Sequence, residues 1–301
     1  MQSAGRVFDI SISTRVGIKS LVLPAPAKLN LFLHITGRRD DGYHLLQTVF
    51  QFLDYSDEIQ LSLRGDGVIQ RVKGLEDIPQ ESDLCVRAAK LLQAFTQSPL
   101  GVDLSIEKKL PIGGGIGGGS SDAATVLQGL NKLWDCKLSN DELAELGLQL
   151  GADVPVFIRG FSAWAEGVGE QLTPIELDEK WFLVIHPKIS VSTAEIFIDK
   201  ALTRDCEALK IARFLKGESL EKLINVFEPV VRNKYPEIAN ALDWLSQFSP
   251  SRLTGTGACL FASFEREEKA KQVLDQLPKK WQGFVAKGLN KSPLKSALLK
   301  P

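Results

Sequence analysis

Residues 111–121, with the sequence PIGGGIGGGSS, have the composition that most directly suggests chemistry. Six of the seven positions from 113 to 119 are glycine, and each glycine in an ordered segment costs roughly 0.5–1 kcal/mol relative to alanine. Without Cβ atoms, successive backbone N–H groups can turn toward an anion, and a helix starting after the run adds the positive end of its dipole. The run therefore predicts a phosphate-binding loop, with the hydroxyl groups of Ser120 and Ser121 as further donors.

Two other interpretations of the glycine run are weaker. A flexible linker is disfavoured because the run lies between a predicted strand and a predicted helix and contains no string of serines or charges. A dinucleotide fingerprint matches formally at Gly113, Gly115 and Gly118. That fold needs a strand after the helix, however, and residues 136–151 predict a turn and a second helix. A Walker A loop is excluded because Gly-Lys-Ser/Thr does not occur.

Single residues elsewhere have types suited to catalysis or binding, and their patterns alone leave two interpretations open. Asp153, in GADVPVF, is either a turn or capping aspartate or a general base whose pKa is raised by partial burial. Lys28 begins the segment KLNLFLHI and is either a solvated lysine at a strand end or a charge in a site. Tyr43 and His44 follow a tight turn and are either surface residues or a binding pair.

The first half of the chain predicts the elements that would position these residues. In residues 28–35, leucine and isoleucine alternate onto one face while Lys28, Asn30, Phe32 and His34 fall on the other, which predicts a strand. The other predicted elements are strands within 45–63, a helix at 82–95 capped by Ser82 or Asp83, a strand at 102–110, a helix starting at Ser120 or Ser121, a helix at 139–151, and strands at 152–160 and 161–175.

The order of elements changes near residue 181. The segments from there on predict a strand at 181–187, helices, a strand at 253–264, a helix at 265–277 and a strand at 283–290. This order indicates a second α+β unit with a boundary between residues 165 and 180. We therefore expect an α+β fold of two domains, at 21–170 and 171–301, after a disordered extension at 1–20.

Composition restricts the class of protein. With 301 residues and a net charge of −1, the chain has no overall charge that favours nucleic acid or an acidic membrane surface. No apolar run approaches the roughly 18 residues of a membrane-spanning helix. The four cysteines are scattered, as in reduced cytoplasmic proteins, and the three dispersed histidines predict no zinc site. A cytoplasmic protein that acts on a small molecule is expected.

The segment PIGGGIGGGSSDAA resembles the phosphate-binding motif of the GHMP kinases, a family that includes galactokinase, homoserine kinase, mevalonate kinase and phosphomevalonate kinase. Residues 24–55 are similar to the amino-terminal motif of those members that phosphorylate 4-diphosphocytidyl-2-C-methyl-D-erythritol. GADVPVF and LTGTGACLF are similar to their remaining motifs, and the order is the same over residues 24–294. The resemblance implies two lobes, the first like domain 2 of ribosomal protein S5 and the second ferredoxin-like.

The resemblance also implies a reaction, the ATP-dependent phosphorylation of the 2-hydroxyl of that substrate in the non-mevalonate isoprenoid pathway. Asp153 would be the general base and Lys28 its electrostatic partner, and Mg²⁺ would accompany ATP, with Ser121 as the one candidate ligand. The residues implied in ATP binding are Pro111, Ile112, Gly113, Gly114, Gly115, Ile116, Gly117, Gly118, Gly119, Ser120, Ser121, Asp83 and Lys108. Those implied in binding the cytidyl substrate are Asn30, Tyr43, His44, Thr193 and Phe197, and the protein would be a monomer or homodimer.

The chain departs from the family pattern at the start of the helix predicted at 82–95. Family members commonly carry Asn-Leu there, with the asparagine at the nucleotide base, whereas this chain has Asp83 and Leu84. An aspartate accepts a hydrogen bond from the adenine amino group but has no amide donor. Altered nucleotide affinity or ATP preference is therefore expected.

Two rival functions use the same fold. One is a GHMP kinase for homoserine or a mevalonate phosphate, which DDGYH and KLNLFLHI disfavour because those enzymes have no use for a nucleobase pocket. The other is a catalytically silent ATP-binding regulator. The presence of both Lys28 and Asp153 disfavours that alternative.

Overall fold

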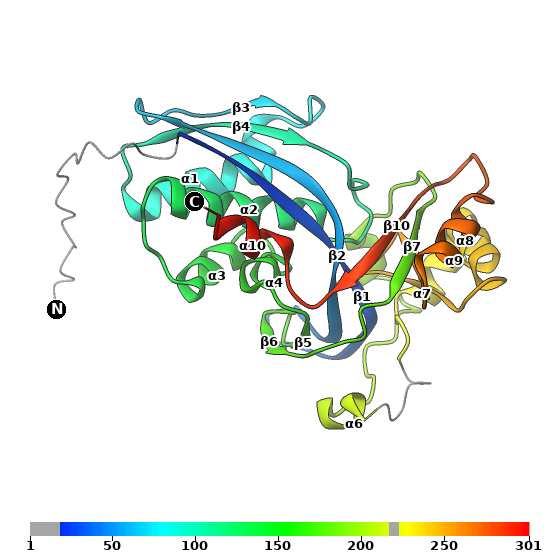
Figure 1. Cartoon of the computed structure of the whole chain (residues 1–301). Helices are drawn as coiled ribbons and strands as arrows, with labels where there is room; N and C mark the ends of the chain where they lie inside the picture. The colour runs from blue at the N-terminus through cyan, green and yellow to red at the C-terminus, as the bar shows by residue number, and fades with distance from the viewer. Residues whose placement is uncertain (1–18, 217–222, 301) are drawn as a thin grey trace.

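A long antiparallel pair of strands, β1 (Ser20–Arg38) and β2 (His44–Arg64), forms the main part of the sheet in the N-terminal lobe. In Figure 1 the lower end of this pair lies beneath the second lobe. The computed structural model describes residues 19–216 and 223–300. The extension expected at 1–20 lies almost wholly outside these residues, and Ser20 already belongs to β1. β2 is the central strand, because β1, β4 and β5 all pair with it.

The remaining strands of this lobe extend the sheet on both sides of β2. The outer strand β3 pairs in parallel with β4, and β6 pairs antiparallel with β5. Their bounds are β3 (Ile69–Lys73), β4 (Gly101–Glu107), β5 (Ala163–Glu166) and β6 (Gln171–Pro174). The sheet thus has one broad face for helices to cover.

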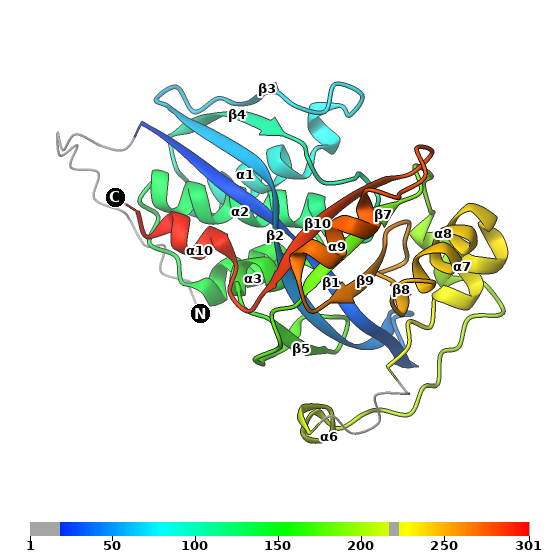
Figure 2. The same cartoon turned by 45° about the vertical axis from the view of Figure 1, so that its right-hand side comes forward.

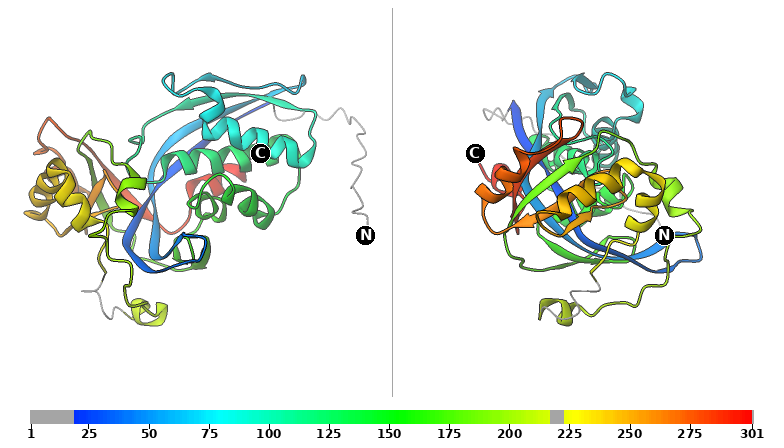
Figure 3. Two further views of the ribbon diagram at one scale, coloured as in Figure 1. Left: turned by 180° about the vertical axis from the view of Figure 1, so that it is seen from behind. Right: turned by 90° about the vertical axis from the view of Figure 1, so that its right-hand side faces the viewer.

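Helices cover one face of this sheet: α2 lies against β1 and β2, and α1 lies beside α2, against β3 and β4 (Figures 1 and 3). Their apolar residues form one core with the sheet, including Leu61, Leu104 and Leu127. Leu294, near the end of the chain, belongs to the same core, so the last described helix returns to the first lobe. The bounds are η1 (Gln80–Ser82), α1 (Leu84–Thr96), α2 (Gly118–Leu133), α3 (Asn140–Leu148), α4 (Val154–Arg159) and α10 (Pro293–Leu298).

The C-terminal lobe is an antiparallel sheet with the strand order β10-β7-β9-β8 and helices on its outer face (Figure 2). The chain order is strand, helices, two strands, helix, strand, so this lobe is ferredoxin-like and the predicted two-lobed α+β fold is confirmed. The bounds are β7 (Trp181–His186), α5 (Thr193–Phe197), α6 (Ile211–Leu215), α7 (Glu228–Lys234), α8 (Pro236–Ser246), β8 (Ser251–Leu253), β9 (Leu260–Phe264), α9 (Glu267–Leu274) and β10 (Gln282–Leu289).

The two lobes share a core and a strand pairing. Val184 and Phe261 on the inner face of the C-terminal sheet pack with Leu29 of β1 and Ile116 of the glycine loop. β10 pairs with β2 at Gly288–Leu53 and Leu289–Phe52. Both faces of the middle of β1 are therefore covered, which explains why the polar face predicted there is buried as well.

Three predicted boundaries are wrong. Residues 154–159, predicted as part of a strand, form helix α4, whose first turn contains Pro155. The prediction failed because a short, buried helix is apolar on all sides, so the periodicity of its residues does not distinguish it from a strand. Helix α2 begins at Gly118, so neither Ser120 nor Ser121 is its N-cap. The strand predicted at 253–264 is two strands separated by a loop.

Candidate active site

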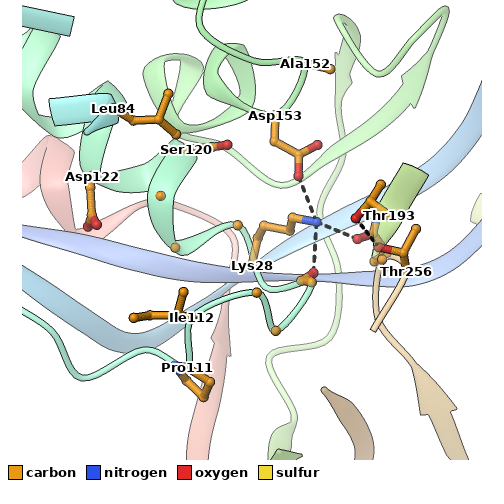
Figure 4. Close-up of a pocket in the computed structure, with 18 of the residues that line it drawn as sticks. Lys28, Leu84, Pro111, Ile112, Ser120, Asp122, Ala152, Asp153, Thr193 and Thr256 are labelled. Atoms are coloured by element: carbon orange, nitrogen blue, oxygen red, sulfur yellow. Dashed lines mark hydrogen bonds and ion pairs between the residues drawn. The ribbon is translucent and has the colours of Figure 1, made fainter. Parts of the chain in front are cut away.

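A cavity of about 580 Å³ lies between the glycine loop and the C-terminal lobe, and residues from both lobes line it (Figure 4). One end is lined by Leu75, Asp83 and Leu84, and the other by Thr193 and Phe197. The glycine loop, Lys28 and Asp153 line the middle. The size is within the range of small-molecule sites in proteins.

The glycine loop is shaped by contacts that leave no room for side chains. Gly115 has φ +71°, and a Cβ atom there would lie 2.3 Å from the carbonyl oxygen of Thr254. Gly117 has φ +75°, and its Cβ would lie 2.7 Å from the Phe157 ring. These glycines are therefore required by close packing and by left-handed backbone, in addition to any bound anion.

The start of α2 supplies backbone donors to the cavity. The first hydrogen bond within the helix runs from Ser121 N to Gly117 O, at 2.8 Å. The amides of Gly118, Gly119 and Ser120 precede it and have no acceptor within the helix, and all three residues line the cavity. These free donors and the helix dipole give this end of α2 an arrangement that can bind an anion.

The loop between β8 and β9 holds the glycine loop in place. The backbone amides of Ala258 and Cys259 donate to Gly113 O at 3.3 Å and Gly114 O at 3.0 Å. The hydroxyl of Thr254 donates to Gly115 O at 3.3 Å. This side of the loop is therefore fixed by the C-terminal lobe.

Lys28 and Asp153 face each other beside the glycine loop, as Figure 4 shows. Lys28 Nζ lies 3.1 Å from Asp153 Oδ2 and donates to Asn30 Oδ1 at 2.6 Å and Gly115 O at 3.3 Å. Lys28 is only 2% exposed, so it is not the solvated lysine of the alternative interpretation. Asp153 occupies the N-cap position of α4, but its side chain makes no capping hydrogen bond there and is 35% exposed.

Asn30 is fixed by two threonines that sequence reasoning did not single out. Its Nδ2 donates to Thr48 Oγ1 at 3.0 Å, and its backbone amide donates to Thr254 Oγ1 at 3.0 Å. Thr48 in turn donates to Phe32 O at 2.5 Å. Nothing in the sequence marks Thr48, because the contact depends on the register between β1 and β2.

Asp83 caps helix α1 at the far end of the cavity. Its Oδ1 accepts from Cys85 N at 2.7 Å, and its Oδ2 pairs with Arg71 Nη1 at 2.5 Å. Asp83 is buried and lines the cavity. Both carboxylate oxygens therefore already have partners within the protein.

Lys108 lies between two buried carboxylates, Asp57 and Asp122. Its Nζ lies 2.8 Å from Asp122 Oδ2 and also bonds Asp57, whose Oδ1 accepts from the amides of Lys109 at 2.6 Å and Leu110 at 2.8 Å. Burial alone would lower the pKa of Lys108, but Asp122 and Asp57 raise it above its ordinary value. Lys108 therefore lines the cavity as a cation. No local sequence pattern marks its partner Asp57.

Asp122 is the less satisfied of the two carboxylates. Its Oδ1 is buried without a hydrogen-bond partner among the described residues. Burial raises the pKa of Asp122, Lys108 lowers it in part, and the nearby Asp57 raises it further. The pKa of Asp122 is therefore raised to about 7, so this carboxylate takes up a proton far more readily than an ordinary aspartate.

Of the residues expected to bind the cytidyl substrate, some line the cavity and others do not. Thr193 and Phe197 line the cavity, and Thr193 Oγ1 lies 2.9 Å from Thr256 Oγ1. The His44 ring packs on Phe197, with centroids 5.2 Å apart, but His44 is outside the cavity lining. Tyr43 is 66% exposed and is also outside it.

The described residues contain no group of three or more His, Cys, Asp or Glu side chains that could hold a metal ion. Ser121 does not fit as a ligand, because its hydroxyl is fully buried and is not part of the cavity lining. Within the same part of the chain, no helix is long and apolar enough to cross a membrane. All four cysteines are free thiols.

Two family models match the chain, one in each lobe. The model for the GHMP kinases N terminal domain matches residues 83–161, and that for GHMP kinases C terminal matches residues 199–283. The first match contains the glycine loop and Asp153. The predicted family is thereby confirmed.

Relatives in sequence and in structure agree with these matches. The 4-diphosphocytidyl-2-C-methyl-D-erythritol kinase of Nitrosococcus oceani is 57% identical over 280 residues, which are 93% of this chain and 99% of its own. The kinase of that name from Alkalilimnicola ehrlichii is 58% identical over 271 residues, 90% of this chain and 92% of its own. A crystal structure of 4-(cytidine 5'-diphospho)-2C-methyl-D-erythritol kinase has a TM-score of 0.75 at 29% identity, over 89% of this chain and 99% of its own. The chain therefore belongs to the GHMP kinase family and is a small-molecule kinase.

Proposed function

We propose that the chain transfers the γ-phosphoryl group of ATP to the 2-hydroxyl of 4-diphosphocytidyl-2-C-methyl-D-erythritol, in the non-mevalonate pathway to isoprenoids. The observation that carries the proposal is the ion pair of the buried Lys28 with the partly exposed Asp153, 3.1 Å apart, beside the backbone amides at the start of α2. The names of relatives at 57% and 58% identity support the choice of substrate.

The proposed arrangement of ATP follows the lining of the cavity. Its phosphates would lie against the amides of Gly118, Gly119 and Ser120, with Lys108 next to the first turn of α2. The adenine would lie toward Leu84 and Asp83 at the far end of the cavity. In this orientation the γ-phosphate points toward Lys28 and Asp153.

Asp153 would accept the proton of the substrate hydroxyl while that oxygen bonds the γ-phosphorus and the bond to the ADP oxygen breaks. Lys28 would be the electrostatic partner of Asp153 and would stabilise negative charge on the transferred group. Asn30 has one side-chain N–H left to donate to the polyol, since its other side-chain N–H donates to Thr48 Oγ1. The cytosine would lie near Phe197 and His44, with Tyr43 closing on it from the surface.

Mg²⁺ would accompany ATP and neutralise phosphate charge. The described residues offer no cluster of protein ligands for it, and Ser121 does not fit.

Replacing Asp153 by asparagine tests this mechanism. The Asp153→Asn enzyme is expected to bind ATP normally and to lose at least about 10²-fold in turnover, the low end of a general-base contribution. Turnover is measured as ADP release with the cytidyl substrate, and ATP binding by calorimetry. Asp141→Asn, on the exposed surface of α3, is the matched control and should stay at the wild-type rate. Near-normal turnover of the Asp153 variant would assign the base elsewhere.

A further inference from the structure

Arg204, between α5 and α6, makes contacts that the proposed reaction does not explain. Its Nη2 donates to the carbonyl oxygens of Phe197 at 2.8 Å and Asp199 at 2.7 Å, and its Nη1 donates to Leu202 O at 3.0 Å. Its Nε donates to His44 Nε2 at 3.3 Å. One guanidinium group therefore holds both members of the His44–Phe197 ring pair.

The contact with His44 determines where the imidazole carries its proton. A guanidinium group has only donors, so His44 Nε2 must accept and cannot carry hydrogen. The neutral ring then has its hydrogen on Nδ1. Burial, Arg204 and Arg38 lower the pKa of His44, so the neutral form is the one present at neutral pH.

We propose that Arg204 is a positioning residue that fixes His44 as the tautomer protonated on Nδ1 and thereby makes the pyrimidine pocket select cytosine over uracil. The inference rests on the proposed function, because it takes His44 to face the base. N3 of cytosine is an acceptor, whereas N3 of uracil carries hydrogen. A donor fixed at Nδ1 therefore matches the first base and opposes the second.

Nitrogen NMR of the histidine rings in the full-length protein tests the first half of this proposal. The chain has only three histidines, and the signals of His44 are identified by their loss in His44→Asn. The wild type is expected to show His44 protonated on Nδ1. In Arg204→Gln the hydrogen should move toward Nε2 and the pKa of His44 should rise, since a positive charge is lost while Arg38 remains. A wild-type ring protonated on Nε2 overturns the proposal.

Calorimetric binding of CDP and UDP tests the second half, with the ATP site filled by a non-hydrolysable ATP analogue. The wild type should prefer CDP, and Arg204→Gln should reduce that preference about tenfold, the effect of one hydrogen bond. Arg232→Gln, a surface arginine paired with Asp243, is the control and should keep the wild-type preference.

A double-mutant cycle separates positioning from mere support of the loop. The amide nitrogen of an asparagine at position 44 stands where Nδ1 stands and always carries hydrogen, so it needs no arginine to orient its protonation. In the His44→Asn background, Arg204→Gln should change the CDP preference less than about twofold. An equal loss in both backgrounds would show that Arg204 acts only through the backbone carbonyls and would overturn the proposal. If the cytidyl substrate is not phosphorylated, the proposed function fails, and the NMR and nucleotide-binding results still decide the role of Arg204.

Discussion

At the scale of single residues, a lysine ammonium removed from water needs oxygen atoms around it, and Lys28 has them on three sides. Asn30 Oδ1, Gly115 O and Asp153 Oδ2 lie within 3.3 Å of its Nζ. The ammonium group that these oxygens surround lies 3.1 Å from Asp153 Oδ2, beside the glycine loop. The side chain of Asp153 is 35% exposed to the cavity, so it remains accessible to a hydroxyl group.

The buried cluster around Lys108 leads to a prediction about stability. Asp57→Asn removes a fully buried carboxylate that bonds two backbone amides and Lys108, so the free energy of unfolding should fall by about 3–5 kcal/mol. Asp122→Asn removes a carboxylate whose pKa burial raises to about 7, and it should change stability far less at neutral pH. Chemical denaturation of both variants gives the comparison, and an equal loss in both would contradict the assignment.

The same cluster predicts a dependence on pH. Because the pKa of Asp122 is raised in the folded protein, its contribution to the free energy of unfolding is complete below its unfolded pKa and is lost as pH rises through the folded pKa. Asp122→Asn lacks this titration, so it should become more stable relative to the wild type as pH rises from 4 toward neutral, roughly the window above the ordinary aspartate pKa. A stability difference that does not change with pH would rule this out.

Asp83 leads to a prediction about the nucleotide. Asp83→Asn keeps an oxygen for Cys85 N but loses the ion pair with Arg71. Its amide nitrogen is a new donor, which can donate a hydrogen bond to guanine O6. The preference for ATP over GTP in kcat/KM should therefore narrow by about tenfold. Arg71→Gln breaks the same ion pair without adding a donor and should keep the preference. Equal ATP and GTP kinetics in wild type and Asp83→Asn would remove a role for this position.

The sequence supports the roles of single residues only in part. Its pattern leaves Lys28 and Asp153 between ordinary and catalytic interpretations, and the family resemblance favours the second. Thr48 and Asp57 have no local signal, because their importance comes from partners 18 and 51 or more positions away. Burial and pairing, which decide these cases, are properties of the tertiary structure.

At the scale of elements, the glycine loop allows a matched comparison of two glycines. Gly113 and Gly115 have similar positive φ angles of +67° and +71°, but a Cβ at Gly113 would meet only Ser190 Oγ at 3.8 Å, while one at Gly115 would lie 2.3 Å from Thr254 O. Gly113→Ala should cost only the backbone strain of roughly 1–2 kcal/mol. Gly115→Ala should lose more stability and at least about tenfold in turnover, because the loop must move off the C-terminal lobe.

Thermal unfolding and ADP release check this pair of variants. Similar losses in Gly113→Ala and Gly115→Ala would mean that backbone strain alone explains the glycines, and the close approach of the two loops would not matter for activity.

The elements also show what a local pattern can indicate. The amphipathic helices α1 and α3 are predicted because one face of each is polar and a capping residue begins each. Helix α4 is not, because Val154, Val156 and Ile158 are buried and β-branched, which favours a strand when only the neighbours in sequence are considered. Its helical form depends on packing against α2 and α3.

At the scale of the whole molecule, the two-lobed order follows from the sequence, whereas the contacts between lobes do not. The change in element order near residue 181 indicates the second lobe, and the ferredoxin-like sheet confirms it. The return of α10 to the first lobe and the hydrogen bond from Val226 N to Leu33 O of β1, at 2.9 Å, leave no local pattern. The site depends on these contacts, because residues of both lobes line the cavity.

The measurement that tests the central claim most directly is ADP release with Mg·ATP and each of three acceptors. These are 4-diphosphocytidyl-2-C-methyl-D-erythritol, homoserine and phosphomevalonate. We predict turnover with the cytidyl compound alone. Turnover with either of the others would keep the fold and contradict the pocket assigned to Tyr43, His44 and Phe197, and silence with all three while ATP still binds would contradict catalysis itself.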